Sequence, residues 1–338
     1  RRSALISLSD LDDEQMRKSK QGQFWVENGQ RSMANNSAVY LEKPSTEVFL
    51  EEWMDLIKSG TGERGIFNRG GLMKQLPKRR IENWKAAGIV DENDHIVDLP
   101  GSNPCGEITL RSKQFCNLTS IVVRPRDTVE DLKRKVRLAT ILGTYQATLT
   151  HFGYLSKEWQ QNCEEEALLG CSITGYYDNK IIRNEKVLRD LKAEAIKTNK
   201  QYAKKLGINE STCITTIKPH GNSGQLLNVG SGMHPWFAKH YIRRVRIAVN
   251  DPLYKLMMDQ GVPSKPEVGY STANSTVAVL EFPMKAPEGA ITKDKVSALD
   301  LLAEWKRLKE NYIEHNPSVT IYVGPDEWLK VASFVYEN

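Results

Sequence analysis

The chain has 338 residues, of which 40% are hydrophobic and 26% are charged. This composition excludes collagen-like and disordered proteins, and every apolar run breaks before the ~18 residues that a membrane-spanning helix needs. The formal net charge of +5, from 47 basic and 42 acidic residues, suits phosphate-bearing partners but does not by itself predict nucleic acid binding. The first residues contain no secretory apolar core with a small-residue cleavage site, so we expect a cytoplasmic protein.

The stretch 46–59 is predicted to be an amphipathic helix that begins at Ser45. Residues 60–71 are rich in glycine and predict a series of turns. The polar stretch 76–98, which contains the basic run 78–80, is predicted to cross the surface as a solvated face.

A capping box formed by Thr128 and Asp131 predicts the start of a long helix. Apolar residues at steps of three and four indicate its buried face, which is predicted to consist of Leu132, Val136, Ala139, Leu142 and Leu149. Two further helices are expected over 156–170 and 184–206.

The β-branched run 213–218 predicts a strand that leads into a loop, and two more strands are predicted over 275–282 and 318–323. Between the last two, Ser297 is predicted to cap a helix with an apolar face of Leu301, Trp305, Leu308 and Tyr312. Strands separated by helices of this length predict a parallel α/β sheet or barrel. Because no linker divides the sequence, we expect residues 1–338 to form a single unit, cut at both ends from something longer.

Five cysteines are present: Cys105, Cys116, Cys163, Cys171 and Cys213. An odd number in a chain of ordinary size does not indicate a secreted disulfide scaffold. No C-x-x-C occurs and the histidines do not cluster with cysteines, so we expect no structural metal site. The last three cysteines lie in helical or strand patterns and are predicted to be core residues.

The stretch 101–108 carries the most chemical information. If residues 103–107 are extended, a period of two places Asn103, Cys105 and Glu107 on one side. The intervening proline and glycine forbid a helix and permit a tight loop with the thiol at its tip. An amide and a carboxylate can hold a polyhydroxylated substrate by hydrogen bonds while sulfur reacts with it.

Cys116 follows eleven residues after Cys105 and could return across a hairpin to the same pocket as a redox thiol. The alternative is that Cys105 and Cys116 are small buried hydrophobes, which is the usual role of a free cysteine. Spacing alone leaves both interpretations open.

Asn-Pro-Cys-Gly-Glu-Ile over 103–108, followed by Cys-Asn-Leu over 116–118, resembles the active-site finger loop of ribonucleotide reductases, in particular the adenosylcobalamin-dependent class. The resemblance covers essentially the whole chain. Further stretches that resemble this class are 33–40, which is similar to a barrel strand, 138–150, 168–179 and 317–320. The implied fold is part of the ten-stranded α/β barrel of these enzymes, with a finger loop at about 101–118 that carries the radical cysteine.

The resemblance implies that the protein reduces ribonucleotides to 2′-deoxyribonucleotides with adenosylcobalamin as the radical source. Cys105 would become a thiyl radical and abstract the ribose 3′ hydrogen, and Glu107 would accept the proton of the 3′-hydroxyl. Asn103 would hold the hydroxyls, with Ser102 beside it as a substrate contact. Cys116 would supply one of the two reducing thiols.

Residues 218–225 form a second candidate site, where backbone N–H groups at a strand-to-helix turn can cradle an anion. The resemblance implies a loop for the substrate phosphates, with contacts from Pro219, His220, Gly221, Asn222 and Ser223. His220 and Asn222 replace the serine and threonine of the commoner form, which leaves the number of contacted phosphates open. A plain turn is the alternative, but the stretch 231–235 follows at the distance found in the family.

Arg1 and Arg2 resemble the end of the loop that binds a deoxynucleotide effector. The family also implies a thioredoxin-like or other dithiol reductant. Its members have an upstream strand cysteine that pairs with the counterpart of Cys116, and a C-terminal cysteine pair. Neither occurs here, so we expect companion segments or chains to supply the missing strands, and no turnover by this chain alone.

Three rival interpretations stay open. The first is a reductase with a separate metal-containing radical subunit, although the cysteine spacing and residues 138–179 resemble the cobalamin class more closely. The second is a non-catalytic nucleotide-binding or assembly subunit. The third, a nucleic-acid-binding protein, would depend on the basic runs 78–80 and 243–246 and ranks last; we interpret 243–246 as structural or as a general attraction for phosphates.

Overall fold

The computed structural model describes residues 5–267 and 269–338, so the predicted effector-loop residues Arg1 and Arg2 lie outside the described part. The chain divides into two compact units, where the sequence predicted one. The first unit holds the described residues up to His234 and again from Ser297 to Asn338, and the second holds Pro235–Val296. All predicted site residues that the structure describes belong to the first unit.

One parallel sheet of the first unit has the strand order β1-β2-β3, with Ser7 opposite Asn36 and Ala38 opposite Ile66. Its strands are β1 (Leu5–Ser9), β2 (Ala34–Tyr40) and β3 (Gly65–Asn68). β2 covers most of the stretch 33–40 that was expected to be a barrel strand. β3 corrects the prediction of turns alone over 60–71, because a four-residue strand gains its hydrogen bonds from a distant neighbour that periodicity does not reveal.

The helices around this sheet are short, apart from the predicted helix over 46–59. They are α1 (Glu14–Lys18), α2 (Phe24–Glu27), the 3-10 helix η1 (Gly29–Met33) and α3 (Thr46–Ser59). The Ser45 side chain accepts a hydrogen bond from the Val48 N–H, as expected of an N-cap. α3 packs through Phe49 and Trp53 against Leu302 and Val331, which belong to α11 (Ala298–Asn311) and α12 (Trp328–Glu337).

A second parallel pair consists of β6 (Asn117–Val122) and β7 (Leu169–Thr174). Single parallel bridges continue this arrangement from Cys171 to Thr215 and from Ile217 to Pro317. The predicted strand over 213–218 is therefore buried and bridged but does not form a full ladder. The predicted strand over 318–323 is not a strand, although Ser318 N donates to the carbonyl of Ile217.

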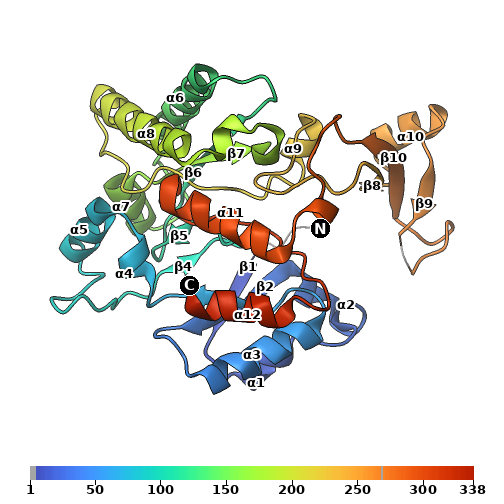
Figure 1. The fold of residues 1–338 in the computed structure, drawn as a ribbon, viewed down its shortest axis with the longest axis horizontal. Coiled ribbons are helices and arrows are strands. Elements are labelled where there is room, and N and C mark those ends of the chain that lie inside the picture. Colours follow the sequence, from blue (N-terminus) through green and yellow to red (C-terminus); the bar gives the residue numbers. More distant parts are fainter. Residues whose placement is uncertain (1–4, 268) are drawn as a thin grey trace. The chain divides into compact units, whose positions relative to one another are not determined.

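The helices of this part of the chain are α6 (Val129–Gln146), α7 (Lys157–Glu166) and α8 (Glu185–Leu206), of which α6 packs against both β6 and β7. α8 lies beside α6 (Figure 1). The capping box of Thr128 and Asp131 is present. α7 ends earlier than the predicted 156–170, because Ala167 adopts a left-handed conformation and the chain then enters β7.

The buried face of α6 differs from the predicted one at its C-terminal end. Leu132, Val136 and Ala139 are buried, but Leu142 is 62% exposed and Leu149 is 70% exposed. Thr140, Gly143 and Thr144 take their place on the buried face. Small residues let α6 approach β6 and β7 closely, which a count of apolar side chains does not detect.

The remaining elements of the first unit include the basic stretch. They are α4 (Leu72–Gln75), α5 (Lys78–Ala86), β4 (Gly101–Ser102), β5 (Thr109–Leu110), η2 (Tyr176–Asp178), η3 (Ile181–Arg183) and α9 (Ser223–Leu226). α5 corrects the prediction of a solvated face over 76–98, because Arg80 and Trp84 are fully buried. α11 begins with the predicted cap at Ser297, and Leu301, Leu308 and Tyr312 are buried as expected.

The second unit is a three-stranded antiparallel sheet with the order β8-β10-β9. Its elements are β8 (His240–Ala248), α10 (Pro252–Asp259), β9 (Ser264–Pro266), β10 (Val277–Lys285) and η4 (Lys293–Lys295). The basic run 243–246 lies on β8, where Arg244 pairs with Glu281 and Arg246 with Glu267. These ion pairs support the structural interpretation of the run.

Parallel strands separated by helices bear out the predicted α/β class. The described residues do not show a closed ten-stranded barrel. Within the same residues, no helix is both long and apolar enough to cross a membrane, and no group of three or more potential ligand side chains could hold a metal ion.

Candidate functional site

A short hairpin carries the first candidate cysteine. β4 and β5 pair antiparallel, with Ser102 opposite Thr109. Between them Gly106 N donates to the carbonyl of Asn103 at 2.9 Å, which closes a four-residue turn. Pro104 suits the second position of this turn because its φ is fixed, and Gly106 has φ +80°, which favours glycine. We call residues 103–107 the tip and residues 109–116 the returning arm.

The turn corrects one prediction about the tip. Residues 103–107 are not extended, so the period-of-two argument that placed Asn103, Cys105 and Glu107 on one side is wrong. Pro104 and Gly106 favour a tight turn over a strand, and the Cys105 side chain is exposed there. Cys105 is therefore not a buried small hydrophobe.

The backbone of the tip is held by neutral side chains from two other segments. Ser318 Oγ donates to the Cys105 carbonyl at 2.6 Å, and Asn316 Nδ2 donates to the Gly106 carbonyl at 3.0 Å. Asn35 Nδ2, on β2, donates to the Pro104 carbonyl. Because three successive carbonyls are bonded, the position of the exposed thiol is set by β2 and by the chain after α11.

Cys105 lies on the wall of a cavity of about 630 Å³ in the first unit. One part of this wall is polar and contains Asn35, Asn36, Ser37, His234, Asn316 and Ser318. Another part is apolar and comes from α3, α11 and α12, with Trp53, Leu302, Trp305, Trp328 and Val331. A molecule with a polar and an apolar end could therefore reach the thiol.

The other predicted catalytic residues do not line this cavity. Asn103 Oδ1 accepts a hydrogen bond from Ile108 N at 2.9 Å, which tightens the turn. The hydroxyl of Ser102 donates to the Asn103 carbonyl at 3.1 Å. Glu107 is only 2% exposed, and its carbonyl accepts from Thr216 Oγ1 at 2.9 Å. The structure thus separates the thiol at the cavity from the amide and the carboxylate that neighbour it in sequence.

Cys116 ends the returning arm and is half-buried. It packs against an apolar cluster that includes Leu72, Trp84 and Cys213. Burial raises the pKa of the Cys116 thiol, and the positive charge of Arg80 opposes that rise. The thiol is therefore protonated at neutral pH in the folded protein.

The predicted phosphate loop reaches the same cavity through Pro219. His220 is only 4% exposed and has φ +51°. Its Nε2 lies 3.0 Å from Ser120 Oγ and 3.1 Å from Ser172 Oγ, and its Nδ1 lies 2.8 Å from Ser223 Oγ. The imidazole thus ties the loop to β6 and β7, a structural role that the sequence did not predict.

His234 lines the cavity and was not predicted as a site residue, although it lies in the noted stretch 231–235. Its Nδ1 donates to the Ser231 carbonyl at 2.6 Å, and its Nε2 accepts from Thr320 N at 2.9 Å. Burial lowers the pKa of His234, in keeping with a neutral ring. The imidazole therefore attaches the segment after Pro317 to the wall of the cavity.

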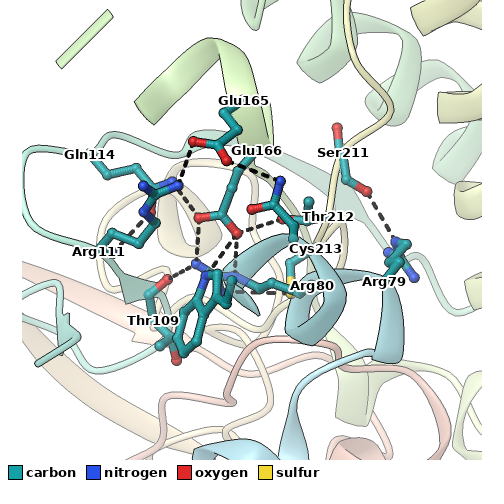
Figure 2. Close-up of polar contacts among 12 residues, drawn as sticks. Arg79, Arg80, Thr109, Arg111, Gln114, Glu165, Glu166, Ser211, Thr212 and Cys213 are labelled. Atoms are coloured by element: carbon teal, nitrogen blue, oxygen red, sulfur yellow. Dashed lines mark hydrogen bonds and ion pairs between the residues drawn. The ribbon is translucent and has the colours of Figure 1, made fainter. Parts of the chain in front are cut away.

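A buried ion pair beside the returning arm was also missed. Arg80 Nε donates to Glu166 Oε1 at 2.8 Å, and both side chains are fully buried (Figure 2). Burial opposes the ionisation of Glu166, but Arg80 and the other donors around the carboxylate keep its pKa below the ordinary value. Arg80 belongs to a run of three basic residues, which is typical of a solvated face, so no local signal indicates its burial.

Comparison with known proteins gives a consistent result. No family model matches the chain. It is similar to proteins named adenosylcobalamin-dependent ribonucleoside-triphosphate reductase from Lactobacillus acidophilus (27% identity, 98% of this chain and 46% of the relative), from Lactobacillus helveticus (25%, 100% and 47%) and from Lactobacillus leichmannii (28%, 85% and 40%). A solved B12-dependent (class II) ribonucleotide reductase matches with a TM-score of 0.73 at 23% identity, over 98% of this chain and 48% of that one.

These matches bear out the resemblance seen in the sequence, and the structural match extends it to the fold. The chain spans about half the length of the curated relatives it matches.

Proposed function

We propose that this chain is the part of an adenosylcobalamin-dependent ribonucleotide reductase that holds the radical cysteine, Cys105. The observation that carries the proposal is the exposed thiol on a proline–glycine turn at the wall of a cavity. The similarity of the whole chain to such enzymes supports it. The relatives are named triphosphate reductases, which favours a ribonucleoside triphosphate as the substrate. The alternation of helices and parallel strands fits a part of the ten-stranded barrel, with residues 101–118 as its finger loop.

The described residues fit the cofactor in one respect, since the Cys105 thiol is open to a cavity rather than enclosed. Bound adenosylcobalamin would supply the initiating radical that removes the hydrogen atom from this thiol. The Cys105 thiyl radical then takes the 3′ hydrogen of the ribose and returns a hydrogen atom at the end of the cycle. Contacts from Asn35, Asn316 and Ser318 keep the sulfur in place because they bond the backbone on which it is mounted.

Asn103 and Glu107 are proposed to act on the ribose hydroxyls from positions that flank Cys105, with Ser102 as a further substrate contact. The support for these roles is that the three residues lie next to Cys105 in the hairpin. They do not line the cavity themselves. Two thiols are needed when the 2′-hydroxyl leaves as water, and each gives one electron and one proton. Cys116 is proposed to be one of them. The second thiol would come from outside this chain, and the two sulfurs would form a disulfide.

The substrate phosphates are proposed to lie on the loop 218–225, for which the place of Pro219 on the cavity wall is the support. A dithiol reductant would reopen the disulfide, and a deoxynucleotide effector would act near Arg1 and Arg2. Companion segments or chains would supply the rest of the barrel, since the chain spans half of its relatives. We place the enzyme in the cytoplasm, the compartment in which deoxyribonucleotides are made in bacteria such as those of its relatives.

Substitution Cys105→Ser tests the proposal, in an assay of the chain together with the segments that extend it to the length of its relatives. With adenosylcobalamin and a dithiol, the variant is expected to lose deoxyribonucleotide formation, because an alcohol does not yield the radical that a thiol yields. The matched control is Cys171→Ala, which removes a buried cysteine away from the cavity and should retain turnover.

Retention of activity in Cys105→Ser would support the non-catalytic subunit instead. Activity without cobalamin, but with a metal-containing partner subunit, would favour the other class of reductase. Purified alone, the chain is expected to show no turnover.

A further inference from the structure

We propose that the buried Arg80–Glu166 pair is a positioning device for the Cys116 thiol, which it holds through the returning arm of the hairpin. The inference rests on the proposed function only for the role of that thiol. Arg80 lies on α5 and Glu166 is the last residue of α7, so the pair joins two helices that each contact the arm.

The carboxylate of Glu166 is saturated with donors (Figure 2). Oε1 accepts from Arg80 Nε at 2.8 Å, from Thr212 Oγ1 at 2.9 Å and from the Trp84 indole N–H at 3.1 Å. Oε2 accepts from Gln114 Nε2 at 2.5 Å and from Arg80 Nη2 at 3.3 Å. A buried carboxylate that accepts this many hydrogen bonds is fixed in both position and charge.

Two of these contacts lead into the returning arm. Arg80 Nη2 also donates to the Thr109 carbonyl at 3.0 Å, at the start of the arm. Gln114, two residues before Cys116, is bound to Glu166 by its amide nitrogen and accepts from Arg111 N with its amide oxygen at 3.0 Å. The ion pair is therefore hydrogen-bonded to the start of the arm at Thr109 and to Gln114 near its end.

α7 holds the middle of the arm independently. Arg111 donates to Glu165 at 2.8 Å, and Phe115 N donates to Cys163 Sγ at 3.3 Å. The Phe115 ring stacks on Trp159 with the centroids 4.6 Å apart. These contacts define the path of the arm along α7, and the ion pair adds the link to α5.

The charge of Arg80 also acts on the thiol. The groups that face Cys116 are Arg80 of α5, Glu166 of α7, Glu107 of the tip and Cys213 of the bridged segment 213–217. Burial raises the pKa of Cys116, Arg80 lowers it, and the other three groups raise it. Since thiol–disulfide exchange proceeds through the thiolate, the guanidinium favours the form that Cys116 needs when a dithiol regenerates it.

Stability alone does not account for the pair. Apolar residues of the same volume would join α5 and α7 at least as well, because two buried charges lose their hydration. Apolar residues could not bind the Thr109 carbonyl and the Gln114 amide, and they would leave no positive charge beside the thiol. Both properties concern the arm.

The test compares Arg80→Met with Arg80→Lys, which both remove the forked contact while only lysine keeps a charge. Alkylation of each cysteine by iodoacetamide at a fixed mildly alkaline pH is followed by mass spectrometry and needs no turnover, so its outcome is separate from that of the proposed function. At such a pH the alkylation rate follows the thiolate fraction, and loss of a charge that lowers the pKa of the thiol by about one unit changes that fraction about tenfold. Arg80→Met should lower the alkylation rate of Cys116 about tenfold, whereas Arg80→Lys should keep most of the rate of the unaltered protein.

Cys105 is the internal control, since it is exposed and should react equally fast in all variants. Cys213, which is fully buried, reports local unfolding by becoming reactive. If Arg80→Met exposes Cys213, Arg80→Lys decides the matter. It keeps a positive charge without the forked contact, so the alkylation rate of Cys116 should stay close to that of the unaltered protein while Cys213 stays protected.

If the pair were purely structural, every substitution in it would loosen the arm and increase the alkylation rate of Cys116. Equal alkylation rates of Cys116 in Arg80→Met and Arg80→Lys, or faster alkylation of Cys116 in Arg80→Lys than in the unaltered protein, would overturn the proposal. Hydrogen exchange supplies the positional readout, because the amides of Arg111 and Phe115 should exchange faster in both Arg80 variants than in the unaltered protein.

Discussion

The two cysteines of the hairpin lie in environments that differ in almost every respect. The tip exposes Cys105 and is held through backbone carbonyls by the neutral side chains of Asn35, Asn316 and Ser318. The returning arm half-buries Cys116 and is held by charged groups that are themselves buried. Neutral side chains that bond only the backbone leave the exposed sulfur free to react with a substrate. Charged side chains near a half-buried thiol instead change how readily that thiol ionises.

The largest expected effect is on the arm. Glu166→Ala leaves Arg80 as an uncompensated buried charge and removes the acceptor of three other side chains, those of Trp84, Gln114 and Thr212. We expect the free energy of unfolding to fall by about 3–5 kcal/mol, measured by urea denaturation followed by circular dichroism.

The matched control is Glu210→Ala, which breaks the exposed pair of Glu210 with Lys200 and should cost no more than about 1 kcal/mol. If the two variants lose similar amounts, the ion pair of the arm behaves like a surface pair and the contrast with the tip disappears.

A second prediction compares the two thiols directly. In the unaltered protein, iodoacetamide should modify Cys105 at least about 100-fold faster than Cys116 at pH 8, because Cys105 is exposed and burial raises the pKa of Cys116. Peptide mass spectrometry over time gives both rates in one sample. In urea, where both segments are unfolded, the ratio should approach one; a ratio near one without urea would contradict the difference in environment.

The smallest predicted effect concerns the support of the tip. His315 precedes Asn316; its Nε2 donates to the Leu169 carbonyl at 2.9 Å, and its buried Nδ1 has no hydrogen-bond partner among the described residues. Burial keeps the pKa of His315 well below its ordinary value of about 6.5. As the pH falls below 6.5, the unfolded chain binds a proton that the folded chain does not, so stability decreases by about 2 kcal/mol between pH 6.5 and 5.

Urea denaturation at these two pH values measures this loss. His315→Gln keeps a donor for the Leu169 carbonyl and does not titrate, so its stability should depend less on pH than that of the unaltered protein. An identical pH dependence in the variant would show that other groups cause the loss.

Sequence patterns predicted the elements that depend on neighbouring residues. The capping box at Thr128, the helix cap at Ser297 and the α/β class all appear in the structure. The tight turn at the tip follows from Pro104 and Gly106, which act on their own backbone. The common side predicted for Asn103, Cys105 and Glu107 was wrong because it assumed extended backbone where these same two residues favour a turn.

The sequence by itself determined that a thiol would lie on a proline–glycine turn, because the φ restrictions and the hydrogen bond that form this turn act within four consecutive residues. Only the tertiary structure decided that Arg80 is buried and that His220 is an anchor. The partner of Arg80 lies 86 residues away, and those of the His220 Nε2 lie 100 and 48 residues away. A charged or polar side chain leaves water only where such a distant partner replaces its hydration, and no local pattern records that partner.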